Sequence, residues 1–312
     1  MNGFAENTCM LEQKRQRATG RLMAVLAAVC FGTESVTVQL CYSGGFNVLT
    51  LLTMRYIVAV AMFLTIVLLT KAPLLVAREY RLTVLGMGLL LISGTFLLFL
   101  ALSKLPATLC ILFYYVYPSL TALLAKLFFK QRLGWVRIAA LLISALGLIL
   151  LYWSSAENIL LSGVLIVFAA ALCHALKLNI LGVILLKNNI YTYSFNSAFV
   201  ATMIVIPVCT VFDGWVFELT APAVGLMLYL ALFVTGAATL LLNRSLSMIP
   251  AVDVSIICLL EPPVTALMAL LIFNERLSFP QLCGGFLILL AVALPQIYTI
   301  YEQKRQHTGQ VV

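Results

Sequence analysis

The sequence predicts an all-α membrane protein in which ten transmembrane helices form a five-plus-five inverted repeat. Three observations support this prediction: an apolar composition, ten apolar segments of helical length and an internal duplication. The chain is 63% hydrophobic and 10% charged, and its mean hydropathy is +1.10. Because a soluble domain of this size does not carry so much apolar surface, the composition indicates that a lipid bilayer is its solvent.

A helix needs about 20 predominantly apolar residues to cross a bilayer. Several segments of the sequence meet this condition, and the loops that join them are short, so little chain remains for a soluble domain. The ten expected helices are 19–40, 46–70, 81–103, 106–127, 134–153, 159–182, 189–212, 221–243, 250–273 and 279–300. These segments are too long for the strands of a transmembrane barrel, and they lack its alternation of apolar and polar residues.

An internal duplication relates the two halves of the chain. Residues 103–133 recur without a gap as residues 247–277, 144 positions later, and 12 of the 31 aligned pairs are identical. The identical pairs include two prolines at the same offset, Pro106 with Pro250 and Pro118 with Pro262. Apolar segments align easily by chance, but paired prolines at one fixed offset do not, so the match indicates a true repeat.

The duplication extends back to the opening helix of each copy, because Ala27–Cys30 corresponds to Ala170–Cys173. Each copy then holds five helices, and an odd number means that the second copy enters the membrane from the opposite side. The predicted parts are a cytoplasmic N-terminal lead at 1–18, a first repeat at 19–153, a second repeat at 159–300 and a cytoplasmic tail at 301–312.

Basic residues gather on one side of the predicted spans. If the N-terminus is cytoplasmic, 15 of the 19 Lys and Arg residues fall on the cytoplasmic side, two fall outside, and Arg55 and Lys177 lie within spans. By the positive-inside rule, this distribution predicts a multi-pass plasma-membrane protein with both termini in the cytoplasm. The net charge of +8 is therefore a topology signal and does not point to nucleic acid.

The sequence carries no enzyme signature. It lacks the GxxxxGK[ST] phosphate loop, the HExxH zinc motif and the GxSxG nucleophile elbow. Its eight cysteines are scattered and it has two histidines, so neither a metal site nor a disulfide framework is predicted. We expect no enzymatic activity and no cofactor.

Inverted repeats have a mechanical use. Two halves related by a pseudo-twofold axis in the membrane plane can pack in two skewed ways, which gives alternating access to a central site. The sequence therefore favours a secondary carrier, whose partners are a small-molecule substrate, the lipid bilayer and, where transport is coupled, protons. Two other functions stay open: a membrane-embedded metabolite sensor and a facilitator channel without coupled transport. Since both halves are in one chain, we expect a single chain to be functional.

Two motifs resemble the EamA-type repeat of the drug/metabolite transporter superfamily. They are PAVDVSIICLLEPPVTALMALLIFNERLS at 250–278 and its partner YVYPSLTALLAKLFFKQRLG at 115–134. Leu242–Leu246 and Met54–Tyr56 also fit the pattern, and the resemblance covers about residues 20–300. It implies a ten-helix carrier that exports amino acids or related metabolites. Such proteins often have Trp-Gly-Ser-Asn in the first helix, whereas this chain has Phe31–Glu34, which adds a charge.

Ionisable groups at membrane depth each cost about 2.5–3.5 kcal/mol on insertion scales, so each needs a partner or a function. Glu34 and Lys177 occupy equivalent positions in the two repeats and are expected to approach the central cavity from opposite halves. They are candidates to bind the ammonium and the carboxylate of an amino acid, and Glu34 is also a candidate for proton coupling. The alternative is a fixed Glu34–Lys177 ion pair that only stabilises the bundle.

Two further basic residues lie within spans. His174 is one turn before Lys177 and could relay protons, although a histidine held by one hydrogen bond inside the bundle is the favoured interpretation. Arg55 in the second helix could bind a substrate carboxylate or satisfy the carbonyl of a broken helix, and the two readings weigh equally.

Aromatic residues surround Pro118 in the fourth predicted helix. Tyr114 and Tyr117 could recognise a polar substrate, with aromatic packing as the alternative, and aromatic packing is the expected role of Tyr115. Pro118 and Pro262 are expected to kink their helices and to act as a pair of hinges. Glu261, the equivalent of Tyr117, is a candidate coupling carboxylate or a structural group at the kink.

The turn between the eighth and ninth helices carries opposite charges. We expect Arg244 and Asp253 to form a salt bridge that closes the cytoplasmic gate.

Overall fold

The computed structural model describes residues 2–102, 104, 110, 113–128, 130, 133–151, 161–212, 214–216, 218–273 and 278–308. All regular secondary structure in these ranges is helical. Among the described residues, seven helices are long and apolar enough to cross a membrane, and two apolar helices, Trp135–Leu150 and Phe279–Pro295, are shorter. The chain is therefore an all-helical, multi-pass membrane protein.

The helices follow one another with short connections. In chain order they are α1 (Asn2–Gly32), α2 (Glu34–Ser43), α3 (Val48–Leu69), η1 (Arg78–Tyr80), α4 (Arg81–Leu102), α6 (Tyr117–Leu127), α7 (Trp135–Leu151), α8 (Leu161–Ile184), α9 (Ile190–Val211), α10 (Ala221–Tyr229), η2 (Leu230–Ala238), α11 (Thr239–Leu246), α12 (Ala251–Ile257), η3 (Cys258–Leu260), α13 (Glu261–Phe273) and α14 (Phe279–Thr308).

Each predicted span contains at least one of these helices, but three spans are divided. The first is divided at Thr33, the eighth contains the π-helical η2, and the ninth contains the 3-10 segment η3. The fourth predicted span lies partly outside the described residues, and its helix α6 begins at Tyr117. The division into five plus five helices stays a prediction.

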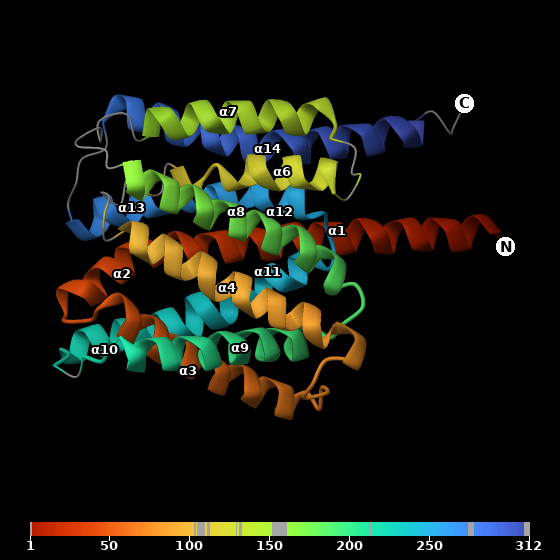
Figure 1. The fold of residues 1–312 in the computed structure, drawn as a ribbon. Coiled ribbons are helices and arrows are strands. Elements are labelled where there is room, and N and C mark those ends of the chain that lie inside the picture. Colours follow the sequence, from red (N-terminus) through yellow and green to blue (C-terminus); the bar gives the residue numbers. More distant parts are fainter. Residues whose placement is uncertain are drawn as a thin grey trace.

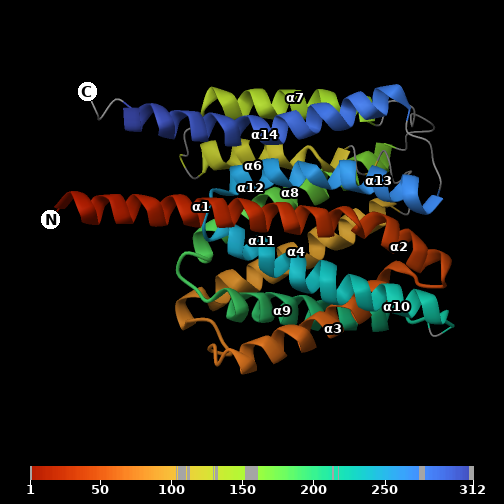
Figure 2. The same cartoon turned by 180° about the vertical axis from the view of Figure 1, so that it is seen from behind.

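The long helices run side by side along one common direction, as Figure 1 shows. Both chain ends lie at the same end of the bundle, where α1 and α14 extend beyond the other helices (Figures 1 and 2). The helix α14 continues to Thr308, so the predicted tail at 301–312 is helical over most of its length.

Helix starts and helix contacts follow the duplication. The helices α6 and α13 begin 144 residues apart, at Tyr117 and Glu261, and α7 and α14 begin at Trp135 and Phe279 with the same offset. The equivalent helices α7 and α14 pack against each other, as do α3 and α9. The contact between α4 and α8 has its counterpart in the contact between α11 and α1.

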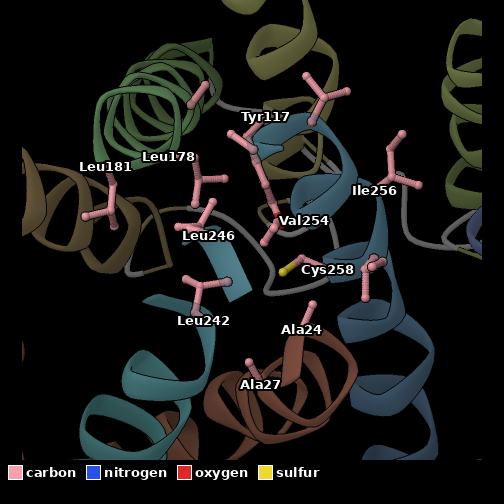
Figure 3. Packing of buried hydrophobic residues seen from close by; sticks show 14 of the residues in the cluster. Ala24, Ala27, Tyr117, Leu178, Leu181, Leu242, Leu246, Val254, Ile256 and Cys258 are labelled. Atoms are coloured by element: carbon pink, nitrogen blue, oxygen red, sulfur yellow. The ribbon is translucent and has the colours of Figure 1, made fainter. Parts of the chain in front are cut away.

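Small residues let α1 pass through the middle of the bundle. Ala24, Ala27 and Ala28 are fully buried and belong to the largest core cluster. Figure 3 shows Ala24 and Ala27 opposite Leu242 of α11 and Cys258 of η3. Because tails of lipid are as apolar as leucine, close packing of small side chains is what holds such helices together.

The breaks in the first and ninth spans lie against each other. A side-chain carbon on Gly32 would lie 2.6 Å from Val264 Cβ, so glycine is needed where α1 meets α13. Thr265 Oγ1 donates a hydrogen bond of 2.6 Å to the carbonyl of Gly32. In addition, Thr33 Oγ1 lies 2.9 Å from the hydroxyl of Tyr229 in α10. These side-chain contacts fix the position of the break between α1 and α2.

The two paired prolines occupy the first turns of helices. Pro118 follows Tyr117 at the start of α6, and Pro262 follows Glu261 at the start of α13. At Pro118 the interruption is sharper than the predicted kink: Phe113 and Tyr114 are helical, Tyr115 and Val116 form a turn, and a new helix begins at Tyr117. The first N–H groups of a helix have no partner within it, so proline is readily accommodated there.

The predicted ion pair between Arg244 and Asp253 is wrong. Arg137 of α7 holds Asp253 instead, with Nε donating to Oδ1 at 2.7 Å and Nη2 donating to Oδ2 at 2.9 Å. The fork of a guanidinium matches a carboxylate, which favours this paired geometry. Arg244 is exposed, while its neighbour Asn243 points inward and donates to Ser194 Oγ. Asn243 and Arg244 are adjacent on one helix and therefore point in different directions. The short sequence distance between Arg244 and Asp253 did not bring their side chains together.

We predict that Gly147→Ala destabilises the contact between α7 and α14. A methyl group there would lie 2.8 Å from Ile288 Cγ1 and 2.9 Å from the carbonyl oxygen of Gly284, so α14 must shift. The expected loss is about 1–3 kcal/mol, measured as a lower thermal midpoint in detergent. Gly285→Ala is the matched control, because nothing lies within 4 Å of its added carbon. Equal midpoints for the two variants would contradict this packing.

Candidate functional site

A cavity of about 160 Å³ lies within the described part of the bundle and is lined by the first, second, third, fourth, sixth, seventh, eighth and ninth predicted spans. Since one water needs roughly 10–15 Å³ of such space, the cavity holds on the order of ten waters or one small solute. Most of its wall is apolar. Its ionisable groups are Glu34, Arg55, Tyr56, Tyr114, Tyr115, His174, Lys177, Tyr193, Cys258 and Glu261.

Six of the predicted site residues line this cavity: Glu34, Arg55, Tyr114, His174, Lys177 and Glu261. Tyr117 is fully buried and packs against its aromatic wall. The predicted hinge and gate residues, Pro118, Pro262, Arg244 and Asp253, are not among the lining residues.

Glu34 pairs with Arg55. Arg55 Nη1 lies 2.6 Å from Glu34 Oε1, and the exposed fraction of the side chain is 5% for Arg55 and 24% for Glu34. The contact places opposite charges against each other inside the bundle. The alternative of a fixed Glu34–Lys177 ion pair is thus wrong. Equivalent positions in the repeats brought both residues to the cavity, but the long side chain of Arg55 reaches Glu34 from α3.

Thr235 fixes the orientation of Arg55. Arg55 Nε donates a hydrogen bond of 2.7 Å to Thr235 Oγ1, and the guanidinium lies 5.9 Å from the ring centre of Tyr56 and 5.6 Å from that of Phe99. Thr235 belongs to the π-helical segment η2, a type of distortion that is frequent at functional sites. No sequence pattern marked this segment, so Thr235 could not be predicted.

Tyr115 holds Glu261. Its hydroxyl donates a hydrogen bond of 2.8 Å to Glu261 Oε2 and so links the starts of α6 and α13. The sequence assigned Tyr115 to aromatic packing and favoured Tyr117 as the polar residue. The turn that precedes α6 reverses this, because it directs Tyr115 towards the carboxyl group. The directions of Tyr115 and Tyr117 could not be predicted from a continuous helix through Pro118.

His174 lies inside an aromatic cluster. Its ring centre is 4.6 Å from that of Tyr117 and 5.7 Å from that of Tyr114, and both pairs meet edge to face. The two tyrosine rings are 5.4 Å apart. His174 forms no hydrogen bond with any residue that the structure describes, so the expected single hydrogen bond is absent there. The ring contacts hold the imidazole in place at the cavity wall.

Lys177 is the cation of the cavity that has no counter-ion in contact. Within the described part of the chain it forms no ion pair or hydrogen bond, and it shares the cavity wall with Glu34 and Glu261. Glu261 likewise has no ion-pair partner among the described residues. One cationic and one carboxylic group are therefore both available to a ligand.

Among the described residues, no group of three or more His, Cys, Asp or Glu side chains could hold a metal ion. The chemistry that these groups support is reversible binding of a charged solute. Asn179, outside the cavity, donates from Nδ2 to the carbonyl of Thr121 at 3.1 Å and so joins α8 to α6.

The arrangement has known relatives. A family model described as the EamA-like transporter family matches residues 18–153 and 161–295. No curated protein matches the chain. A solved structure titled "Crystal structure of protein" is 15% identical, with a TM-score of 0.80 over 90% of this chain and 97% of that one. At this identity the likeness shows the fold alone.

We predict that Glu34→Gln destabilises the protein more than Glu34→Gln combined with Arg55→Met. The single change leaves the buried guanidinium without its counter-charge, which is expected to lower the free energy of unfolding by roughly 2 kcal/mol. The double change removes both charges and should recover part of that loss. Thermal denaturation in detergent measures both, with Glu79→Gln, an exposed carboxylate, as the control. Equal or additive losses would contradict the pairing.

Proposed function

Since the chain belongs to the EamA-like transporter family, we propose that it exports a small polar metabolite, an amino acid or a related compound, by alternating access as a secondary carrier. The observation that carries this proposal is the cavity between the spans, in which Lys177 and Glu261 offer opposite charges without ion-pair partners among the described residues. Charges at membrane depth are costly when unpaired, so a zwitterionic ligand that meets both would be favoured.

The ligand is placed by charge. Its carboxylate lies at Lys177 and its ammonium at Glu261, where the face of Tyr114 can add a cation–π contact. The role assigned to Glu34 from the sequence, binding the ammonium, passes to Glu261 because Arg55 already holds Glu34. The apolar wall, which includes Leu90, Leu98 and Leu242, accepts the remainder of the molecule.

Alternating access is supported by the internal repeat. The two copies, 19–153 and 159–300, have helix starts at matching offsets, and their helices make matching contacts. In the proposed inverted arrangement, the helix starts at Pro118 and Pro262 serve as hinges. These starts are joined through the hydrogen bond between Tyr115 and Glu261, so occupation of Glu261 by a ligand would act on both.

We place the gate at the end of the bundle where both chain termini lie. It uses the ion pair between Asp253 and Arg137, and Arg244 takes no part in it. This end carries most of the basic residues, which supports a cytoplasmic location for it, with the lead 1–18 and the tail 301–312 on the same side. The proposed membrane is the plasma membrane, and the proposed functional unit is one chain.

Proton coupling is proposed at Glu261 ahead of Glu34. Glu34 has a guanidinium 2.6 Å away, whereas Glu261 is held by a tyrosine hydroxyl. A carboxyl group that binds either a proton or a substrate ammonium would exchange one for the other across the membrane.

We predict that Lys177→Met and Glu261→Gln each reduce efflux of labelled amino acids from proteoliposomes about tenfold or more, because each removes one charge-assisted contact with the substrate. In wild type, an inward proton gradient should accelerate efflux, and Glu261→Gln should abolish this acceleration. Lys187→Met and Glu79→Gln are the matched controls, since both side chains are exposed.

Three outcomes would count against the proposal. Binding without net flux, from folded protein, would indicate a sensor. Flux without counter-flow would indicate a channel. Unchanged flux in Lys177→Met would remove the proposed role of that residue.

A further inference from the structure

We propose that Arg55 forms a second anion subsite in the cavity, so that the preferred substrate is an amino acid with an additional carboxylate in its side chain. This inference rests on the proposed function, since it assumes that the α-amino and α-carboxyl groups are bound at Glu261 and Lys177. It adds the chemical class of the side chain, which those two residues do not determine.

Arg55 has hydrogen-bonding capacity that the protein does not use. A guanidinium carries five N–H donors, yet Nε is the one guanidinium nitrogen of Arg55 that donates a hydrogen bond to a described residue. Nη1 is occupied by Glu34 Oε1 at 2.6 Å, whereas Nη2 donates no hydrogen bond to a described residue. The side chain is 5% exposed and lines the cavity. The N–H groups of Nη2 are therefore available to the carboxylate of a ligand.

The surroundings hold the guanidinium ready for an anion. Thr235 fixes Nε, and the rings of Tyr56 and Phe99 flank the group. Arg55 is therefore preorganised, which reduces the entropy lost when a carboxylate binds.

Glu34 acts as the resident counter-ion of this subsite. Its side chain is 24% exposed, much more than that of Arg55, so it can turn into the cavity while the guanidinium stays in place. Glu34 contacts Nη1 alone, so an entering carboxylate can accept from Nη2 and then form two parallel hydrogen bonds with the fork as Glu34 leaves. The exchange leaves Arg55 paired throughout, and the displaced Glu34 carboxylate is stabilised in the cavity by water or by a proton.

An amide of the same size is expected to bind this subsite more weakly than a carboxylate. Glutamine places an NH₂ group where glutamate places an oxygen, and N–H groups cannot pair with the N–H groups of a guanidinium. Sites that require a specific hydrogen bond discriminate strongly against an isostere that cannot make it. The proposal therefore predicts a preference for glutamate or aspartate over glutamine or asparagine.

The test is a titration calorimetry comparison of glutamate and glutamine with the purified full-length chain. Wild type should bind glutamate about tenfold more tightly than glutamine, the effect of one charge-assisted contact. Arg55→Gln should bring the ratio of the two dissociation constants close to one. Arg55→Lys, which keeps the charge and loses the fork, should give an intermediate ratio. Lys177→Met should weaken both ligands by a similar factor and keep the ratio.

Thr235→Val provides a second variant if the Arg55 variants do not fold, because it frees the guanidinium from its anchor and should lower the ratio several-fold. Equal binding of both ligands by wild type, with loss of both in Lys177→Met, would overturn the second subsite and leave the proposed function standing. Binding of other amino acids but of neither test ligand would overturn it in the same way. No binding of any amino acid by folded protein would overturn both.

Discussion

A charge inside a bilayer must find a counter-charge, a hydrogen bond or water, and this constraint organises the centre of the protein. Glu34 and Arg55 meet it by pairing with each other, and Glu261 meets part of it through Tyr115. Lys177 has no ion pair with a described residue, but it lines a cavity that can hold water or a solute. The helices that carry these residues come from both halves of the chain, so the charges join the two repeats at one place.

Interrupted helices bring these side chains together. The breaks at Thr33, at η2 and before α13 each place a polar residue at the cavity: Glu34, Thr235 and Glu261. Within a membrane, non-helical or distorted backbone is tolerated where protein or a water-filled cavity surrounds it. The hydrogen bond from Thr265 to the carbonyl of Gly32 satisfies one such freed group and ties two of the breaks to each other.

The sequence was sufficient for the helical membrane architecture, the repeat and the ionisable lining of the cavity, because apolar length, paired prolines and rare intramembrane charges are local signals. Partner choice was not local. Glu34 pairs with Arg55 and not with Lys177, and Asp253 pairs with Arg137 and not with Arg244. Each choice depends on which long side chain reaches across the packed helices. Thr235 escaped prediction because a π-helical segment has no sequence signature of its own.

The measurement that tests the central claim most directly is the binding of two matched sets of compounds to the purified wild-type protein, one set for glutamine and one for leucine. Each set contains the amino acid itself, the amine that lacks its carboxylate and the acid that lacks its ammonium. If Lys177 and Glu261 together receive a zwitterion, each truncated compound should bind at least about tenfold more weakly than its parent amino acid. Binding of the amine or the acid as tight as that of the parent would contradict the account.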